Sequence, residues 1–497
     1  MKKNQNNDRV NNNMLKVYNT LFRKKEILKP RTLRQAQGKK KINLFICGPT
    51  VYDFSHIGHA RTYIAFDVIV KYLKQKGYGV FYLQNITDID DKIIKRAKEK
   101  KITPRTLARR FEKEYLKDME SLGIDSVTEY ARATDYIKEI ISQAKRLLEK
   151  GYAYEIEDGL YYDISKFKEY GKLSKRTALQ AQDAVSRIDD SKEKRNKGDF
   201  CLWKFSQKGE PTWPFEKLKI KKGRPGWHIE DTAITEKFFG AQYDIHGGAR
   251  DLIFPHHEAE ISQMEAISNK KPLVKYWLHT GFLTVGGQKM SKSLGNFITI
   301  RDFLQKHSPR ILRLLILKSH YRSPIDYNEK TILQTKKEIE RIDELVVKLK
   351  QITKNKKQIT ATVKKLISKN EKDFEKVMDD DFNTPKAVAL IFSLISKANK
   401  LIDQNKLTKK AAKEILNFLK KIDQVFGFIF DEEPEISSRT IKLAKNRKEY
   451  REKGQWEKAD EMRKEIEKEK GCWIVDTKKG SILMKNIGGG TATIEIE

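Results

Sequence analysis

Two short motifs in the sequence carry side chains that suit chemistry at phosphate groups. The first is HIGH at residues 56–59, which follows an apolar stretch and opens a segment with helical periodicity. The start of a helix presents free N–H groups and a partial positive charge, and both attract phosphate. Gly58 lets a nucleotide approach the backbone closely, while His56 and His59 can donate to phosphoryl oxygens. Two histidines at a helix start also suit an ordinary capping role.

The second motif is KMSKS at residues 289–293, which is flanked by glycines on both sides. The glycines predict a mobile loop. Lys289 and Lys292 can then swing onto a triphosphate and stabilise a leaving pyrophosphate, which is electrostatic catalysis without a covalent step. A loop of lysines and serines is also common as a plain solvated loop. The two motifs together, in this order and far apart in the chain, argue against coincidence.

A third group of residues suits a metal ion. The segment FPHHEAE places His256 and Glu260 four residues apart, on one face of an expected helix. That spacing suits two ligands of one metal. Cys47, at the end of the first expected strand, is a third potential ligand. A histidine and a glutamate at this spacing are also a frequent surface pattern.

The stretch GRPGWHIEDTA at residues 223–233 raises a related question. Gly-Arg-Pro-Gly interrupts the chain, and Trp227, His228, Glu230 and Asp231 then follow on what resembles the first turn of a helix. Trp227 and Asp231 are four apart and can share one helix face. Acidic residues in a first turn are also favoured simply by the helix dipole.

The elements that must position these residues form an α/β pattern. A buried strand in KINLFICGPTVYDF, a helix from the HIGH motif and a second strand in GVFYLQNITDIDD form a βαβ unit. Such a unit predicts a parallel sheet with ligands at the carboxyl ends of its strands. Further helices are expected at 104–122, 134–150 and 255–268, further strands near 241–246 and 275–280, and hairpins and loops over 151–205.

The composition limits the possible partners and compartments. The 101 basic residues exceed the 68 acidic residues, for a net charge of +33. Such an excess indicates a polyanionic partner, because neutralising phosphates releases counterions, although a lysine-rich proteome gives the same balance. The three widely spaced cysteines do not suit a disulfide framework. With no signal peptide and no run of 18 apolar residues, we expect a cytoplasmic location and no membrane partner.

The motifs, taken together, resemble the cysteinyl-tRNA synthetase family of class I aminoacyl-tRNA synthetases. The resemblance is carried by FICGPTVYDFSHIGHARTYIAFDVI, NITDIDDKIIKRA, GRPGWHIE, FPHHEAE, KMSKSLGNF and MDDDFNTPKAV, and it runs from about Met14 to about Lys485. It implies a ligase that converts cysteine and ATP with Mg²⁺ into cysteinyl-adenylate and pyrophosphate. The cysteinyl group then passes to the terminal adenosine of the cysteine tRNA. The resemblance also implies a monomer.

The resemblance implies the following division of the chain. We expect a disordered tail at 1–13 and a Rossmann-type catalytic domain at 14–325, with an insertion at about 120–205. An α-helical bundle that binds tRNA is expected at 326–430. A small helix-hairpin domain for the anticodon is expected at 431–497. Lysines within 348–369 and the C-terminal basic helix are the expected phosphate contacts.

The family's functional residues carry over to matching positions of this sequence. The catalytic set is His56, His59, Lys289 and Lys292. ATP binding is implied for His56, Gly58, His59, Gly247, Gly248, Asp251, Lys289, Ser291 and Lys292. Thr50, Thr87 and Trp227 match positions that line the amino-acid pocket.

A zinc ion is implied on the floor of that pocket, held in the family by two cysteines, a histidine and a glutamate. Zinc favours a thiolate over a serine hydroxyl, whereas an apolar pocket separates near-isosteres poorly. Cys47, His256 and Glu260 carry over, but Asp231 stands where the family pattern GWHIEC has its second cysteine. Either Asp231 ligates zinc through an oxygen, at one zinc per chain, or the site has lost its metal. We favour the first, because the other three ligands remain.

Two other functions are compatible with parts of the chain. A cysteine ligase that uses an amino sugar has the catalytic half but lacks a full anticodon-binding region. A non-catalytic RNA-binding relative lacks the chemistry. The basic helical region after residue 328 argues against the first, and the intact HIGH and KMSKS motifs argue against the second. Cys201 and Cys472 are expected to be small core residues. No function is assigned to the basic insert PRTLRQAQGKKK at 30–41.

Overall fold

The computed structural model describes residues 14–30, 40–176, 191–215, 221–290, 294–353, 361–430, 437–469, 472–477, 480–486 and 491–496. The expected tail at 1–13 and most of the basic insert at 30–41 therefore lie outside the described residues.

A five-stranded parallel sheet forms the centre of the catalytic part. Its strand order is β11-β10-β3-β4-β5. The strands are β3 (Lys41–Ile46), β4 (Gly79–Ile86), β5 (Glu129–Arg132), β10 (Tyr243–Ala249) and β11 (Val274–Thr280). Every neighbouring pair is parallel. The predicted α/β class is confirmed, and the order of connection reverses between β3 and β10, where open sheets of this kind hold their ligands.

Helices cover both faces of this sheet. They are α1 (Ile57–Gln75), α2 (Asp91–Glu99), α3 (Pro104–Ser121), α4 (Ile137–Glu149), α5 (Ile229–Phe239) and α6 (His256–Ser268). Side chains of β3 alternate between two buried clusters, since successive residues of a strand point to opposite faces. Leu44 and Ile46 join the cluster that contains α1. Phe45 and Cys47 join the cluster that contains α5 and α6, so Cys47 lies on the face of those two helices.

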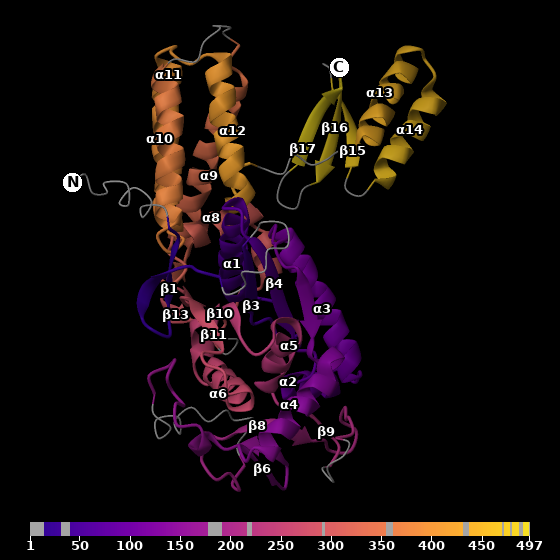
Figure 1. Ribbon diagram of the computed structural model, residues 1–497. Helices are drawn as coiled ribbons and strands as arrows, with labels where there is room; N and C mark the ends of the chain where they lie inside the picture. The colour runs from indigo at the N-terminus through magenta and orange to yellow at the C-terminus, as the bar shows by residue number, and fades with distance from the viewer. Residues whose placement is uncertain are drawn as a thin grey trace, which may run out of the picture.

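The strands between β5 and α5 form a separate antiparallel sheet below the parallel one (Figure 1). Its strands are β6 (Ala153–Ile156), β7 (Gly159–Tyr162), β8 (Phe200–Phe205) and β9 (Gly223–Pro225), in that order. β9 leads directly into the GWHIED segment, so this sheet helps to fix the start of α5. Cys201 lies in β8 with 3% of its surface exposed, packed with Tyr154 and Tyr161, as expected for a core residue.

A helical bundle follows the catalytic part. It contains α9 (Glu329–Lys350), α10 (Ala361–Met378), α11 (Thr384–Asp403) and α12 (Lys409–Phe426), and α7 (Ile300–Leu304) and α8 (Pro309–Leu317) connect it to the catalytic part. The remaining short strands are β1 (Lys16–Asn19) and β2 (Lys24–Ile27) near the N-terminus, and β12 (Leu283–Val285), β13 (Gln288–Lys289) and β14 (Ile325–Tyr327) before the bundle. Pro309 occupies the first turn of α8 after the N-cap Ser308, as predicted from the sequence.

The C-terminal unit stands beside the bundle in Figure 1. It contains α13 (Ser438–Glu452), α14 (Trp456–Lys468) and a three-stranded antiparallel sheet of β15 (Cys472–Thr477), β16 (Gly480–Asn486) and β17 (Thr491–Ile496). The charged amphipathic stretch RKEYREKGQWEKADEMRKEIEKEKG predicts a single helix, and this prediction is wrong because the structure has two. Gly454 adopts a φ of 70° between α13 and α14, which ends the first helix. Cys472 is buried, as expected.

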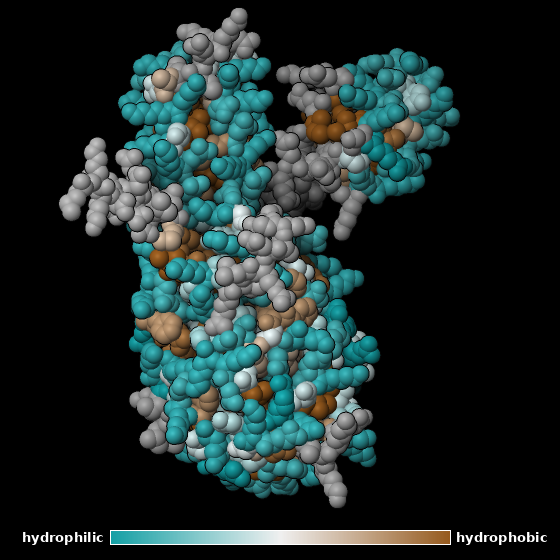
Figure 2. Space-filling model, viewed as in Figure 1, coloured by the Kyte–Doolittle hydropathy of each residue, from teal (hydrophilic) through white to brown (hydrophobic). Residues whose placement is uncertain are grey.

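The face shown in Figure 2 is mostly hydrophilic, with hydrophobic residues in small separate groups. Within the described part of the chain, no helix is both long enough and apolar enough to cross a bilayer.

A buried ion pair joins the catalytic part to the bundle. Arg313 of α8 donates to Asp67 Oδ2 of α1 at 2.8 Å, and to the carbonyls of Phe426 and Leu122 at 2.8 and 2.9 Å. The Arg313→Met variant should lose about 2 kcal/mol in its free energy of unfolding, because the buried Asp67 carboxylate loses its guanidinium and keeps only Lys71 Nζ, at 3.0 Å. Urea denaturation measures the difference. The exposed pair Lys421–Glu371 supplies the control, since Glu371→Gln should cost less than about 1 kcal/mol. Equal losses in the two variants would contradict the prediction.

Candidate active site

The start of α1 is held by the histidines of the HIGH motif. His56 is the N-cap, and its Nδ1 accepts the N–H groups of Gly58 and His59 at 3.1 and 3.3 Å. His59 Nδ1 in turn accepts the N–H of His56 at 3.4 Å, and the two rings stack with centroids 3.8 Å apart. Because each Nδ1 is an acceptor, the neutral rings carry their protons on Nε2 and donate from there.

His59 acts here as a neutral donor. Its burial and the neighbouring His56 ring lower the pKa of His59 well below the usual value. The ring is therefore uncharged near neutral pH. The helix start thus combines imidazole N–H donors with the positive end of the helix dipole, an arrangement that suits phosphoryl oxygens.

Met290 of the KMSKS motif and the segment that follows the motif both lie against this helix start. A Cβ at Gly58 would lie 3.3 Å from Met290 Cε. After the loop, Phe297 meets the His56 ring edge-on at 5.1 Å, and Thr299 pairs with His56 in an antiparallel bridge. The two motifs are thus brought together. Lys289 is exposed on β13, with its Nζ 5.9 Å from the centre of the Phe282 ring. Ser291 and Lys292 lie outside the described residues.

The residues predicted to bind the adenosine lie at the end of β10 and directly after it. Gly247 and Gly248 end the buried part of that strand, and Asp251 lies in the 3-10 turn after it. A Cβ on Gly248 would lie 3.2 Å from the His257 ring. A Cβ on Gly247 would lie 2.3 Å from the Phe66 ring and 2.8 Å from a backbone carbonyl, so Gly247 allows α1 to approach the sheet.

The close contact at Gly247 predicts a loss of stability on substitution. Gly247→Ala should lower the free energy of unfolding by about 1–3 kcal/mol, because the added methyl group overpacks the interface between α1 and the sheet. Gly79→Ala is the matched control, since a Cβ there meets no atom within 4 Å. Urea unfolding of both variants measures the difference, and a neutral Gly247→Ala would refute the packing role.

The three residues predicted to line the pocket for the amino-acid substrate lie close together. Thr50 and Trp227 line a cavity of about 120 Å³. Thr50 pairs with Thr87 in a parallel bridge, and the Thr87 hydroxyl donates to the buried carboxylate of Glu230. Trp227 stacks on the ring of His256 with centroids 4.4 Å apart. Trp227 therefore joins this cavity to the histidine that faces the candidate metal site.

The four predicted metal ligands form one buried cluster. His256 Nε2 lies 3.0 Å from Asp231 Oδ2 and 3.3 Å from Glu260 Oε1. The donor atoms of Cys47, Asp231, His256 and Glu260 all lie within 4.8 Å of one another. Tetrahedral zinc with bonds of 2.0–2.3 Å places its ligand atoms about 3.3–3.8 Å apart. The cluster therefore has close to the required size.

The cluster also holds polar atoms that a cation would satisfy. Asp231 Oδ1 and both carboxylate oxygens of Glu260 are buried without a hydrogen-bond partner among the described residues. Burial and the neighbouring acids raise the pKa of the Cys47 thiol, and burial and Asp231 raise the pKa of Glu260. These shifts have one cause, which is negative charge gathered away from water. A divalent cation offsets that charge, so the residues present fit a zinc ion.

Four further histidines surround the cluster, and sequence reasoning assigned a role to none of them. They are His228, His246, His257 and His279. His228 Nδ1 lies 2.8 Å from His256 Nδ1, which leaves Nε2 of His256 to face the carboxylates. A second hydrogen-bonded path runs from Thr20 through His279 and His257 to Cys47, with distances of 2.8, 2.8 and 3.1 Å.

Two of these histidines make a second possible donor set. Cys47, His246, His257 and Glu260 also have donor atoms within 4.8 Å of one another. His246 Nε2 lies 3.4 Å from Cys47 Sγ, and its Nδ1 accepts from or donates to the Tyr243 hydroxyl at 2.6 Å. The two sets share Cys47 and Glu260, so they describe one buried Cys/His/Glu centre with two possible pairs of remaining ligands.

The site can now be compared with known proteins. The family profile described as tRNA synthetases class I (C) catalytic domain matches residues 33–337, and the DALR domain matches residues 373–431. A cysteine–tRNA ligase of Thermococcus gammatolerans is 42% identical over 483 residues, which cover 94% of this chain and 98% of that protein. The chain belongs to the cysteine–tRNA ligase family. Members from Thermoplasma volcanium and Methanococcus maripaludis are 43% and 42% identical, over 95% of this chain in each case. They cover 96% and 100% of those proteins.

Solved structures agree with this fold. A Mycobacterium tuberculosis methionyl-tRNA synthetase in complex with methionyl-adenylate aligns with a TM-score of 0.56 and 16% identity, over 78% of this chain and 89% of that one. A leucyl-tRNA synthetase of Agrobacterium radiobacter K84 in a ternary complex aligns with a TM-score of 0.59 and 10% identity, over 79% of this chain and 84% of that one. At these identities the likeness concerns the fold. The chain thus shares its fold with these two synthetases.

The position of Trp227 in the GWHIED segment differs from what the sequence predicted. Trp227 and Asp231 were expected on one face of a first helical turn, but α5 begins at Ile229, and His228 is its N-cap. Trp227 therefore precedes the helix. The two side chains still meet at His256, one by stacking and one by its carboxylate. Their common neighbour, rather than helical spacing, brings them to one site.

Proposed function

We propose that this chain works as a cysteine–tRNA ligase through the residues gathered at the carboxyl edge of its parallel sheet. A single observation carries the proposal. The HIGH helix start, the loop that follows β13 and the buried Cys/His/Glu centre converge on the strand ends of β3 and β10. A ligase of this kind needs its nucleotide and its amino acid side by side at such a place.

In the first step, a carboxylate oxygen of cysteine attacks the α-phosphorus of ATP, and the bond to pyrophosphate breaks. His56 and His59 donate from Nε2 to phosphoryl oxygens on which negative charge increases. Lys289 and Lys292 stabilise the departing pyrophosphate, with Ser291 beside them and Mg²⁺ bound to the ATP. Gly58 keeps the helix start open to the phosphates, while Gly248 and Asp251 hold the adenosine. Gly247 supports this subsite by letting the strand lie close to α1.

The cysteine side chain is selected by the buried centre. We assign Cys47, Asp231, His256 and Glu260 as the ligands of one zinc ion. The buried Asp231 Oδ1, which has no hydrogen-bond partner in the described structure, favours this set over the alternative with His246 and His257. When bound, zinc supplies a soft Lewis acid that distinguishes a thiolate from a hydroxyl. His228 orients the His256 ring through their 2.8 Å contact. Thr50 and Trp227 border the amino acid, and Thr87 fixes Glu230 below it.

In the second step, a hydroxyl of the terminal ribose of the tRNA attacks the carbonyl carbon of the adenylate, and AMP leaves. The bundle at 326–430 and the unit at 431–497 are the proposed tRNA-binding domains. Lys348, Lys350, Lys364, Lys365 and Lys369 are exposed on α9 and α10, and the lysines between them lie outside the described residues. They suit contacts to phosphates of the cysteine tRNA, bound to one copy of the chain.

The experiment that tests this function separates its two steps. Cysteine-dependent ATP–pyrophosphate exchange measures the first, and charging of the cysteine tRNA measures the second. Both activities are expected. Exchange without charging would instead favour the ligase for an amino sugar, and the absence of both would favour an RNA-binding protein.

Charging should also weaken steeply with salt. As few as two phosphate contacts make the Michaelis constant for tRNA rise about twelvefold between 50 and 200 mM salt, because each contact releases a counterion. Initial charging rates at varied tRNA concentration measure this change. The Michaelis constant for cysteine in pyrophosphate exchange is the control and should change little. A salt response equally small for both substrates would count against the lysine contacts.

A further inference from the structure

Two buried histidines outside the proposed ligand set point at the sulfur of Cys47. His257 Nε2 lies 3.1 Å from Cys47 Sγ, and His246 Nε2 lies 3.4 Å from it. Both rings are buried and pack against Trp277, with ring centroids 5.2 and 4.4 Å away, respectively. Packing thus fixes both rings so that each presents one nitrogen to the same sulfur. Which ring nitrogen carries the proton decides what the two histidines do.

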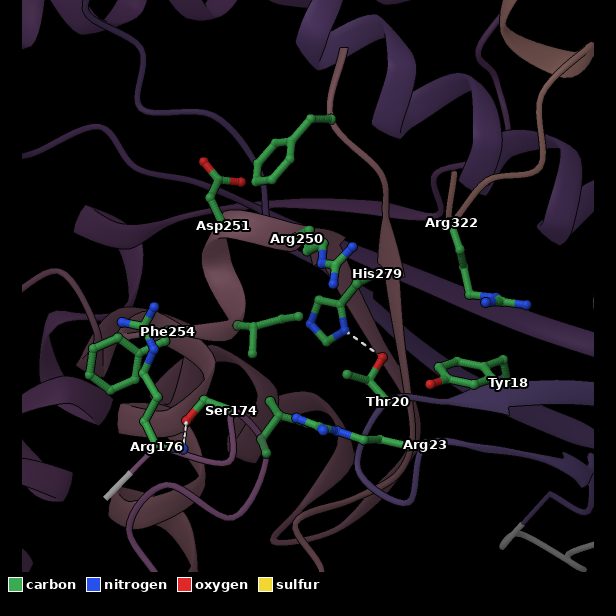
Figure 3. Close-up of a pocket in the computed structure, with 13 residues that line it drawn as sticks. Tyr18, Thr20, Arg23, Ser174, Arg176, Arg250, Asp251, Phe254, His279 and Arg322 are labelled. Atoms are coloured by element: carbon green, nitrogen blue, oxygen red, sulfur yellow. Dashed lines mark hydrogen bonds between the residues drawn. The ribbon is translucent and has the colours of Figure 1, made fainter. Parts of the chain in front are cut away.

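A chain of hydrogen bonds continues from the far side of the His257 ring. His257 Nδ1 lies 2.8 Å from His279 Nε2, and His279 Nδ1 lies 2.8 Å from the hydroxyl of Thr20 (Figure 3). In the proposed zinc site Cys47 is a thiolate, which only accepts hydrogen bonds. His257 must then donate from Nε2 and accept at Nδ1. His279 donates to it from Nε2, and the Thr20 hydroxyl donates to His279 Nδ1, so every polar atom of the chain has a suitable partner.

The Tyr243 hydroxyl holds His246 in the same way. It lies 2.6 Å from His246 Nδ1. Glu260 Oε2 is also near this nitrogen, at 3.5 Å, but it has no hydrogen-bond partner among the described residues. The phenol is therefore the partner of Nδ1, and when it donates there, His246 carries its proton on Nε2 and donates to Cys47. A nitrogen that carries its proton has no free lone pair for a metal, so neither ring is a ligand in this arrangement.

The buried centre needs such donors because most of its ligands are anions. Cys47, Asp231 and Glu260 supply three negative charges against the two positive charges of zinc, and a substrate thiolate adds a fourth. Within the part of the chain that the structure describes, the ion pairs of Asp231 and Glu260 involve only histidines and neither lysine nor arginine. An N–H group aimed at a buried sulfur stabilises negative charge there, and more strongly than it would in water.

We propose that His246 and His257 are positioning residues that donate two N–H···S hydrogen bonds to Cys47 and thereby allow the centre to accept a thiolate substrate. The inference rests on the proposed function, which makes Cys47 a zinc ligand. The hydrogen-bond partners of both rings hold them in the required tautomer. The two histidines favour cysteine without touching it, because they reduce the negative charge that the incoming thiolate meets at Cys47.

Zinc affinity tests the two donors in the full-length protein, by competition with a chromophoric chelator. His257→Leu and His246→Leu each remove one N–H···S hydrogen bond, and each is expected to raise the dissociation constant of zinc about tenfold or more. His257→Gln should stay within about threefold of the parent, because the side-chain amide of glutamine can donate from nearly the position of imidazole Nε2. In the cobalt-substituted protein, the sulfur-to-metal charge-transfer absorption should shift in both leucine variants and stay unchanged in the glutamine variant.

A pair of tyrosine variants covers the case in which a leucine variant fails to fold. Tyr243→Phe removes only the hydroxyl that holds His246, and the dissociation constant of zinc should rise about threefold. Tyr162→Phe is the matched control. It also removes one buried hydroxyl, but that hydroxyl donates to the carbonyl of Ser262 at 3.1 Å, so zinc binding should stay unchanged.

Pyrophosphate exchange at saturating zinc supplies a second readout. The Michaelis constant for cysteine should rise about tenfold in the leucine variants, while that for ATP stays within about twofold. Equal weakening of zinc binding by His257→Leu and His257→Gln would overturn the proposal, because packing rather than an N–H group would then matter. A folded leucine variant that binds zinc like the parent, or a parent that binds no zinc, would also overturn it. If the parent binds zinc but charges no tRNA, the proposed function fails, whereas the zinc constants still decide whether the histidines support Cys47.

Discussion

Replacing His56 by asparagine is expected to slow cysteine-dependent ATP–pyrophosphate exchange by about 10²–10³-fold, the usual cost of one lost donor to a developing charge. Asparagine is among the best N-cap residues, so its side-chain oxygen can accept the N–H groups of Gly58 and His59 in place of the imidazole. The helix start should therefore persist. What the variant loses is the Nε2 donor. Exchange rates at saturating ATP and cysteine measure the effect.

The alanine variant separates the two roles that the sequence left open for His56. His56→Ala removes both the cap and the donor, so it should lose a similar amount of activity and also about 1 kcal/mol of stability. Thermal unfolding of the parent and both variants supplies that comparison. An active asparagine variant beside an inactive alanine variant would mean that His56 works only as a cap.

The second large effect concerns the buried centre. The purified protein is expected to carry about one zinc per chain. Asp231→Asn is expected to weaken zinc binding by at least about 100-fold, because mutating a residue that only hydrogen-bonds to a metal ligand already weakens metal affinity 10–100-fold. Asparagine has nearly the same shape but removes one negative charge from the four donor side chains, whose ligand atoms lie within 4.8 Å of one another. Metal analysis after dialysis against a weak chelator measures retention. The preference for cysteine over serine in activation should fall in parallel.

Two further variants identify the ligand set. Asp231→Cys should keep zinc and hold it more tightly, because thiolate is the softer ligand. His257→Gln should keep zinc if the set is Cys47, Asp231, His256 and Glu260. Loss of zinc from His257→Gln with retention in Asp231→Asn would assign the metal to the other set. A metal-free parent with full activity would mean that the site selects cysteine by shape.

Much of the fold was accessible from the sequence because its signals are local. The apolar run of β3, the periodic residues of α1 and the Ser308-Pro309 start of α8 each determine an element without help from elsewhere. The local sequence does not predict which strands are neighbours in the sheet. β10 pairs with β3, and Asn43 N–H donates to Asp244 across 201 residues of sequence. No local pattern encodes that pairing, and it depends on which faces remain apolar after the helices pack.

The candidate metal ligands were also accessible, because Cys47, Asp231, His256 and Glu260 stand in recognisable motifs. The histidines around them were not. His257 follows His256 directly, and adjacent residues of a helix point in different directions, so one spacing rule cannot select both. His246 and His279 come from two different strands. Only the folded sheet brings them beside Cys47.

At the C-terminus, the charged amphipathic pattern continues through both α13 and α14, so it gave no sign of the break at Gly454. The polar alternation of TATIEI gave only a weak signal for β17, because that strand gains its buried face from β16 and α13.

Helix α1 links two distant parts of the molecule. Its 19 residues span roughly 28 Å at 1.5 Å per residue. At one end the HIGH histidines cap it, and at the other Tyr72 donates to Asp379 and Gln75 donates to Lys421 of the bundle. A helix buried along most of its length is far stiffer than any loop, so its ends cannot move independently. The bundle and the proposed ATP site therefore contact opposite ends of one stiff helix. If the bundle tilts relative to the sheet, both histidines must move with it.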